Sequence, residues 1–195
     1  RAFLVVMMFF ATLSVTYAQD FYIEPKINVL AAGFGIVNPS VEFGFAKHSA
    51  IEFSNVTSFS KNDYLGTGYP LIVILNLVEY RHYLLNEEHK GLFLGGDFGW
   101  DMYKMNKSLI PTAANSDRAY DWGIGIVLGM TAGYKFLITD KLGVELYAAW
   151  GWQHTSHEPY YEGGVLEAPM NKSAEWIPYK AGVTLSYRFG FNRVK

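Results

Sequence analysis

The strongest constraint on the fold is an alternation with a period of two residues, most regular in WGIGIVLGMTAGYKF at 122–136. Every second residue from Trp122 to Phe136 is a large apolar residue or alanine, and most residues between them are glycine. This period is that of a β-strand with one apolar face and one small or polar face. The stretch alone does not indicate which face meets water.

Seven further segments alternate in the same way, which gives eight expected strands, an even number that suits a closed up-and-down antiparallel barrel. The expected strands cover 22–32, 40–46, 50–58, 71–85, 92–105, 122–136, 144–156 and 180–191. Within 71–85, alternate residues point to opposite faces. If Glu79 and Arg81, at odd positions, point inward, Asn76, at an even position, points outward. We therefore expect a bulge or a shifted register near Asn76.

The connections between these segments alternate between short and long. Tight polar turns are expected at 47–49, 86–90 and 139–143, and long loops at 59–70, 106–121 and 157–179. In an antiparallel barrel this order places the long loops at one end and the turns and both termini at the other. That asymmetry is typical of outer-membrane barrels, which have periplasmic turns and extracellular loops.

The two faces carry different chemistry. An eight-stranded interior is only wide enough for ordinary side chains, so we expect the bulky apolar set to face lipid and the polar set, which includes Asp101 and Lys180, to fill a closed lumen without a water channel. The expected lumen ion-pair network is Lys26, Glu42, Glu52, Glu79, Arg81, Asp97, Lys135, Glu145 and Arg188. The expected lipid-facing aromatic residues are Trp100, Trp122, Tyr134, Phe136, Trp150, Trp152, Tyr187 and Phe189.

Composition narrows the function classes. Charged residues make up 17% of the 195 residues and aromatic residues another 17%, whereas soluble domains average roughly 25% charged residues. The net charge of −2 comes without a basic block, so nucleic acid is not an expected partner. There is no cysteine, which excludes disulfides, thiolate catalysis and thiolate metal sites. No cofactor is expected.

Residues 1–18 have the pattern of a cleavable signal peptide: Arg1, an apolar run, and then Thr16 and Ala18 before Gln19. The run is too short for a transmembrane helix, which needs roughly 20 residues. Because the sequence begins with Arg, we expect the signal peptide to be truncated. The expected mature domain is 19–195, exported to the outer membrane of a Gram-negative bacterium.

Four segments carry a resemblance to a known group: SVEFGFAKHSAIEFS at 40–54, VEYRHYLL at 78–85, GVELYAAWGW at 143–152 and YKAGVTLSYRFG at 179–190. They resemble the small outer-membrane barrels related to the OmpA membrane domain. More narrowly, the chain is similar to an uncharacterised family of eight-stranded barrels of the Bacteroidetes type. The resemblance implies fold and location. The expected partners are outer-membrane lipids, lipopolysaccharide and the barrel-assembly machinery.

Two further functions stay open beside a structural role or surface recognition and adhesion through the loops. His154 and Ser156 resemble the His-x-Ser pair of lipid A deacylases, with Glu167 as a third member, although His157 stands where those enzymes have Asn. Serine, histidine and a carboxylate are the parts of an acyl-transfer site. A metal site at His154, His157 and Glu158 is not favoured. The second alternative is a secreted, lipocalin-like binder with the apolar face inward.

Overall fold

The computed structural model describes residues 21–84, 89–109, 118–161, 163, 166 and 170–190 of the chain. Within these residues the fold is an antiparallel sheet of eight long strands and one two-residue strand. The strands are β1 (Tyr22–Asn28), β2 (Pro39–Ala46), β3 (Ser49–Ser60), β4 (Leu71–Tyr83), β5 (Gly91–Met105), β6 (Tyr120–Leu137), β7 (Leu142–Tyr160), β8 (Asn171–Tyr187) and β9 (Phe189–Gly190). Two short helical segments are α2 (Val29–Gly33) and η1 (Lys107–Leu109).

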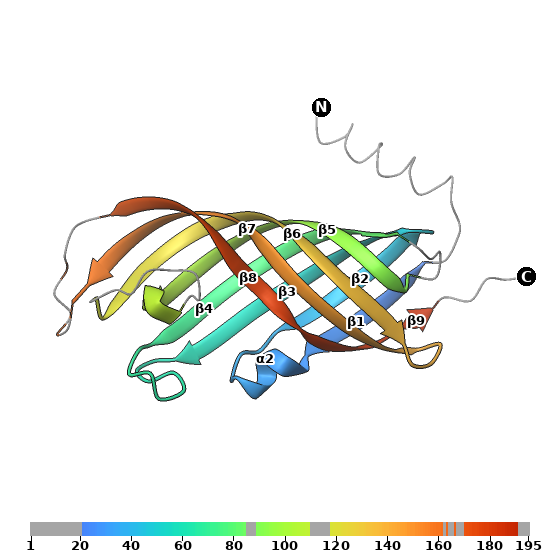
Figure 1. Cartoon of the computed structure of the whole chain (residues 1–195), viewed down its shortest axis with the longest axis horizontal. Helices are drawn as coiled ribbons and strands as arrows, with labels where there is room; N and C mark the ends of the chain where they lie inside the picture. Colours follow the sequence, from blue (N-terminus) through green and yellow to red (C-terminus); the bar gives the residue numbers. More distant parts are fainter. Residues whose placement is uncertain are drawn as a thin grey trace, which may run out of the picture.

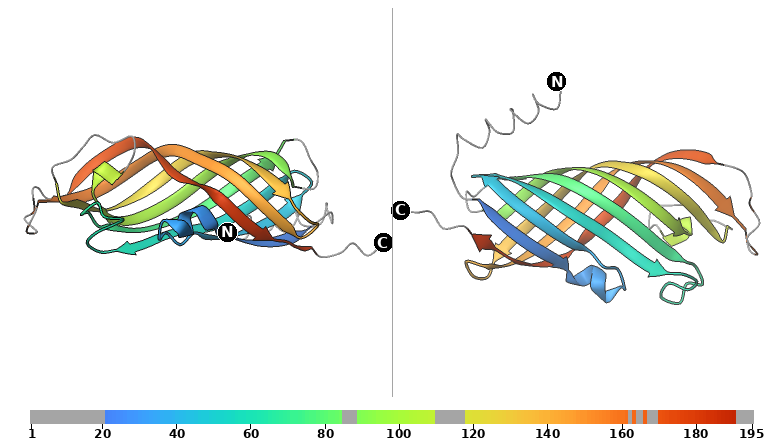
Figure 2. Two further views of the ribbon diagram at one scale, coloured as in Figure 1. Left: turned by 60° about the horizontal axis from the view of Figure 1, so that its bottom comes forward. Right: turned by 180° about the vertical axis from the view of Figure 1, so that it is seen from behind.

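The sheet closes on itself. Its strand order is β2-β3-β4-β5-β6-β7-β8-β1-β9, and β1 also pairs with β2. Pairing of β1 with β8 continues into β9 after a break at Arg188. Figures 1 and 2 show the strands running obliquely around one elongated ring. The all-β, antiparallel fold predicted from the alternation is therefore confirmed.

Connections of different length lie at opposite ends of the ring. Figure 1 shows the turns after β2 and β6 at the end where β1 begins, and the longer connection from β3 to β4 at the opposite end. We call these the turn end and the loop end.

Several strand boundaries differ from the sequence expectation. β1 stops at Asn28, not at residue 32, because the Asn28 side chain accepts a hydrogen bond from the Ala31 backbone nitrogen (3.1 Å) and caps α2. β7 extends to Tyr160 and β8 begins at Asn171. Both strands thus continue into the segment expected to be a loop.

The expected irregularity at Asn76 is wrong. Pairing is continuous through Asn76, which lies opposite Asn55 on β3 and Trp100 on β5. The Asn55 side-chain amide donates to the Asn76 side-chain oxygen at 2.9 Å, so the two outward polar groups satisfy each other. The register shifts lie elsewhere, between Gly44 and Ala46 and between Ala149 and Trp150.

The shift at Ala149 and Trp150 changes the parity of β8. Ala149 pairs with Lys180 but Trp150 pairs with Pro178, so Tyr179 is an extra residue in β8. The Tyr179 hydroxyl reaches the interior and donates to Asp97 at 2.7 Å, and the neighbouring Lys180 is also buried inside the ring. The bulge thus gives two consecutive inward side chains.

The inward glycines of β6 leave space mainly for aromatic rings. A Cβ on Gly129 would meet Tyr179, and one on Gly133 would meet Phe93.

Candidate functional site: the interior of the ring

Ten charged side chains fill the turn-end half of the interior, and we call them the interior network. It comprises Glu24, Glu42, Glu52, Glu79 and Glu145 together with Lys26, Arg81, Lys135, Lys180 and Arg188. Five acidic and five basic groups balance in formal charge. All ten belong to one continuous set of ion pairs.

Arg81 on β4 lies at the centre of the interior network. Its Nη1 atom is 3.0 Å from Glu42, 3.0 Å from Glu52 and 2.8 Å from Glu145. Its Nε atom donates to Glu79 at 2.7 Å. Four carboxylates on four strands therefore converge on one guanidinium, whose five donors suit such a cluster.

The lysines connect the remaining members. Lys26 lies 2.6 Å from Glu42 and 2.8 Å from Glu145. Lys180 lies 2.8 Å from Glu79. Lys135 lies 2.6 Å from Glu24, and the same carboxylate lies 2.8 Å from Arg188. Because buried charges persist when they are paired, this half of the interior is a closed plug.

The interior network brings together eight of the nine residues expected there. Asp97 instead accepts hydrogen bonds from Thr131 (2.6 Å) and Tyr179 (2.7 Å), and among the described residues it takes part in no ion pair. Glu24 was missed, although it has the same parity as Lys26 on β1. That parity is the signal that could have identified it.

An aromatic floor covers the interior network at the turn end. The hydroxyls of Tyr22 and Tyr83 donate to Glu42 at 2.5 and 3.0 Å. The ring of His89, in the turn between β4 and β5, contacts both tyrosine rings edge-on, and its Nε2 donates to the Ser49 carbonyl at 3.3 Å. Burial lowers the pKa of His89, although the nearby Glu42 carboxylate opposes this effect.

The loop-end half of the interior is different, because it contains a cavity of about 290 Å³, which we call the loop-end cavity. Apolar side chains form much of its wall: Val56, Leu71, Val73, Leu75, Val127 and Ile177. Leu75, Leu77 and Val127 pack as one cluster. Tyr64 and Leu109, from the connections after β3 and β5, place the cavity at the loop end.

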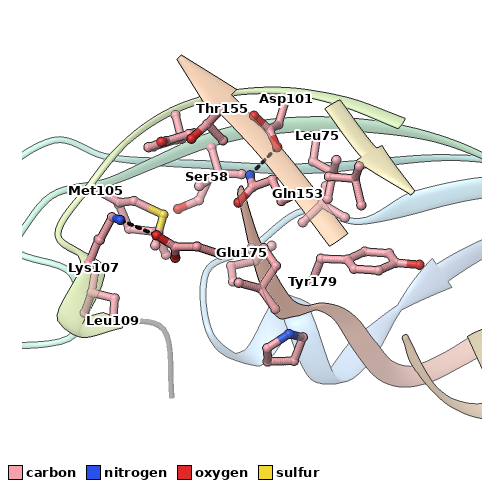
Figure 3. Close-up of a pocket in the computed structure, with 18 of the residues that line it drawn as sticks. Ser58, Leu75, Asp101, Met105, Lys107, Leu109, Gln153, Thr155, Glu175 and Tyr179 are labelled. Atoms are coloured by element: carbon pink, nitrogen blue, oxygen red, sulfur yellow. Dashed lines mark hydrogen bonds and ion pairs between the residues drawn. The ribbon is translucent and has the colours of Figure 1, made fainter. Parts of the chain in front are cut away.

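Polar side chains also line the loop-end cavity (Figure 3). Gln153 donates to one oxygen of the Asp101 carboxylate at 2.5 Å. Lys107 pairs with Glu175 at 2.7 Å, and the hydroxyls of Thr155 and Ser173 are 2.9 Å apart. The sequence expectation of a closed, charged lumen did not predict this cavity.

A signal for the cavity was present in β4. Its first half, LIVIL at 71–75, is apolar on both faces of the strand, whereas a strand with a polar inward face would alternate between polar and apolar residues. The structure turns Leu71 and Leu75 inward, where both are buried.

The expected esterase residues lie on the outer face of β7. The His154 ring stacks on Trp152, with centroids 5.6 Å apart and planes inclined by 13°. Among the described residues no hydrogen bond joins His154 to Ser156, and Glu167 lies outside the described residues. His157 has the opposite parity and is buried inside. In the described part of the chain there is no group of three or more potential metal ligands.

The outer face is apolar over many strands. Of the aromatic residues expected to face lipid, Trp152 is half-buried and the others are exposed: Trp100, Trp122, Tyr134, Phe136, Trp150, Tyr187 and Phe189. Aliphatic side chains such as Ile124, Ile126, Leu128 and Met130 continue this face along β6. Within the described residues, no helix is both long and apolar enough to cross a membrane. The expected signal peptide at 1–18 lies outside the described residues.

These features define a class of protein: a closed antiparallel sheet that is charged inside and apolar outside. The chain belongs to the family described as "Protein of unknown function (DUF3575)", whose model matches residues 3–189. Searches among curated proteins and among solved structures each gave no match. The family description names no activity.

Proposed function

We propose that the protein is an integral outer-membrane β-barrel with a structural role or a role in surface recognition and adhesion through its loops. The observation that carries the proposal is the pattern of burial: charged side chains are buried inside the ring, and apolar side chains are exposed on its outer face. Arg81, Glu42 and Glu79 have no exposed surface, whereas Met130 on the outer face of β6 is 73% exposed. Soluble proteins rarely expose apolar patches of more than a few hundred Å².

The magnitude of this exposure favours lipid as the surroundings. About twenty large outward side chains at roughly 100 Å² each correspond to on the order of 50 kcal/mol of apolar burial. Lipid contact recovers this free energy and water does not. A closed sheet also pairs the backbone groups of every strand, as a membrane interior requires. A lipocalin-like binder needs the opposite burial, so the geometry does not favour that alternative.

The dimensions of β6 support the same proposal. A tilted strand of about 9 to 11 residues crosses the hydrocarbon layer, and the outward apolar side chains of β6 run from Trp122 to Phe136. Aromatic residues lie at both ends of this apolar face, and the ring centroids of Tyr134 and Phe136 are 4.5 Å apart. Aromatic residues are enriched at membrane interfaces.

The closed interior favours anchoring or recognition over transport. The interior network occupies the turn-end half with paired charges, so a water-filled pore does not fit it. The loops are the segments free to vary on a rigid scaffold, where binding functions concentrate. The proposed partners are outer-membrane lipids and lipopolysaccharide around the barrel, the barrel-assembly machinery during insertion, and a surface ligand at the loops.

Fractionation and heat-modifiable mobility test the membrane location. The protein should sediment with outer membranes, and in detergent the unheated form should migrate differently from the boiled form. Recovery of folded protein in the soluble fraction would contradict the proposal. A soluble periplasmic protein expressed in the same cells serves as the control.

Epitope insertion tests the orientation. Gly66, in the connection after β3, has open space around it, and Asp140 lies in the exposed turn between β6 and β7. An epitope after Gly66 should bind antibody on intact cells, whereas the same epitope after Asp140 should bind only after permeabilisation. The reverse pattern would reject the proposed surface role of the loops.

A further inference from the structure

The loop-end cavity combines an apolar wall with one carboxylate that lacks a full set of partners. Asp101 is 95% buried, since its side chain and backbone together are 5% exposed. Gln153 donates to one of its carboxylate oxygens, and the other oxygen, Oδ1, has no hydrogen-bond partner among the residues that the structure describes. A buried acceptor without a partner costs free energy, so this oxygen is suited to receive a donor from a ligand.

The other charges at the cavity do not neutralise Asp101. Lys107 is engaged with Glu175 at 2.7 Å, and those two side chains are partly exposed. In the described part of the chain Asp101 takes part in no ion pair, in contrast to the five glutamates of the interior network. A buried carboxylate is stabilised by a cationic partner. The polar groups that line the cavity therefore favour a cationic ligand over an anionic one.

The apolar wall determines the rest of the ligand. Leu71, Leu75, Val127 and Ile177 line the cavity and are each at most 8% exposed. An apolar cavity is a poor site for water and a good one for hydrocarbon or aromatic groups. The volume of about 290 Å³ lies just below the usual range of ligand sites, about 300 to 1,000 Å³, and suits a small ligand.

We propose that the loop-end cavity binds a small amphipathic amine, whose ammonium group contacts Asp101 and whose apolar body packs against Leu75, Val127 and Ile177. Gln153 holds the carboxylate in place by occupying its other oxygen. The site goes beyond the proposed membrane role and does not depend on it, because the cavity is formed by the closed sheet itself.

Three probes with one apolar body test the proposal: phenethylamine, 2-phenylethanol and 3-phenylpropionate. Binding to the full chain in a neutral detergent is measured by titration calorimetry, with protein-free micelles subtracted. The amine should bind about tenfold or more tightly than the alcohol, since a charge-assisted hydrogen bond replaces a neutral one. The propionate should bind most weakly. Equal binding of amine and alcohol, or no saturable binding of the amine, would overturn the proposal.

Two variants locate the binding. Asp101→Asn should reduce the preference for the amine to less than about threefold while the alcohol still binds. Val127→Phe should weaken all three probes because the larger ring occupies the cavity. Asp140→Asn makes the same change in charge in an exposed turn at the other end and should leave the preference intact. Retention of the amine preference in Asp101→Asn would exclude Asp101 as the partner.

Heat-modifiable mobility of each variant verifies that it is folded before binding is compared. If Asp101→Asn does not fold, Val127→Phe and the three-probe comparison in the unmodified chain still test whether the cavity binds the amine. A protein that fractionates with the outer membrane but shows no amine preference would reject the cavity site and leave the proposed membrane role standing.

Discussion

The Nη1 atom of Arg81 on β4 lies 2.8 Å from Oε1 of Glu145 on β7, across the interior of the ring. Strands that are not neighbours in the sheet are therefore joined by a buried ion pair. The same Nη1 atom also lies 3.0 Å from Glu42 and from Glu52, so removal of this one side chain affects carboxylates on several strands.

Arg81→Met should lower the free energy of unfolding by about 3 to 5 kcal/mol, because it leaves buried carboxylates without their shared cation. The measurement is urea unfolding in detergent, followed by tryptophan fluorescence. Lys61→Met, at an exposed position in the loop after β3, is the control and should change stability by less than about 0.5 kcal/mol. An unchanged midpoint for Arg81→Met would contradict the central role of Arg81.

Gly133→Ala should lower stability by about 1 to 3 kcal/mol through overpacking. An added Cβ would lie 2.6 Å from Cε1 of Phe93 and 2.7 Å from the Leu146 carbonyl oxygen. The backbone oxygen cannot move aside as a flexible side chain could. Gly96→Ala on β5 is the matched control, since its Cβ would have no atom within 4 Å. Equal unfolding midpoints for the two variants would show that the space beside Gly133 is not required.

The buried His89 should make the folded protein less stable at mildly acidic pH. Burial lowers its pKa in the folded state, where Glu42, Arg188, Tyr22 and Tyr83 surround it, whereas in the unfolded chain its pKa is about 6.5. Below about pH 6.5 the unfolded chain therefore binds a proton that the folded chain does not. The free energy of unfolding therefore decreases as the pH is lowered.

His89→Gln removes this titration. As the pH falls from 7.5 to 5.5, the free energy of unfolding of the original chain, measured by urea unfolding, should decrease more than that of His89→Gln. A pH profile that is the same in the original chain and in His89→Gln would refute this prediction.

Ser156→Ala should leave lipid A acylation unchanged. In the described residues Ser156 has no hydrogen bond to His154, whose ring instead stacks on Trp152, so the hydroxyl has no base in contact with it. Mass spectrometry of lipid A from cells that express either form provides the measurement, with an empty-vector strain as control. A change in acylation that depends on the Ser156 hydroxyl would revive the esterase alternative.

The sequence predicts the ring well because parity and loop length are local properties. The parity of Glu79 and Arg81 on β4 and of Lys135 on β6 turns all three inward, and the structure buries each of them. Their mutual distances depend on the register between strands, which alternation alone does not specify.

The features that the sequence did not predict depend on single residues acting against the pattern. Asn28 ends β1 by capping α2, although the alternation continues to residue 32. Tyr179 enters the interior through a bulge opposite Ala149 and Trp150. The loop-end cavity arises where inward apolar side chains from several strands meet without filling the space. That outcome is set by side-chain volumes across the ring and not by any one segment.

Leu128→Arg provides a direct test of whether the outer face meets lipid. Leu128 lies near the middle of the apolar face of β6, opposite Phe98 and Trp152, and is 47% exposed. If this face meets hydrocarbon, the arginine should cost about 2 to 4 kcal/mol near the bilayer centre and reduce the amount of folded protein in the outer membrane. Ile138→Arg, in the exposed turn after β6, should cost about 0 to 1 kcal/mol. If the face met water instead, Leu128→Arg would leave stability nearly unchanged and raise solubility, so the two locations predict opposite results from one substitution.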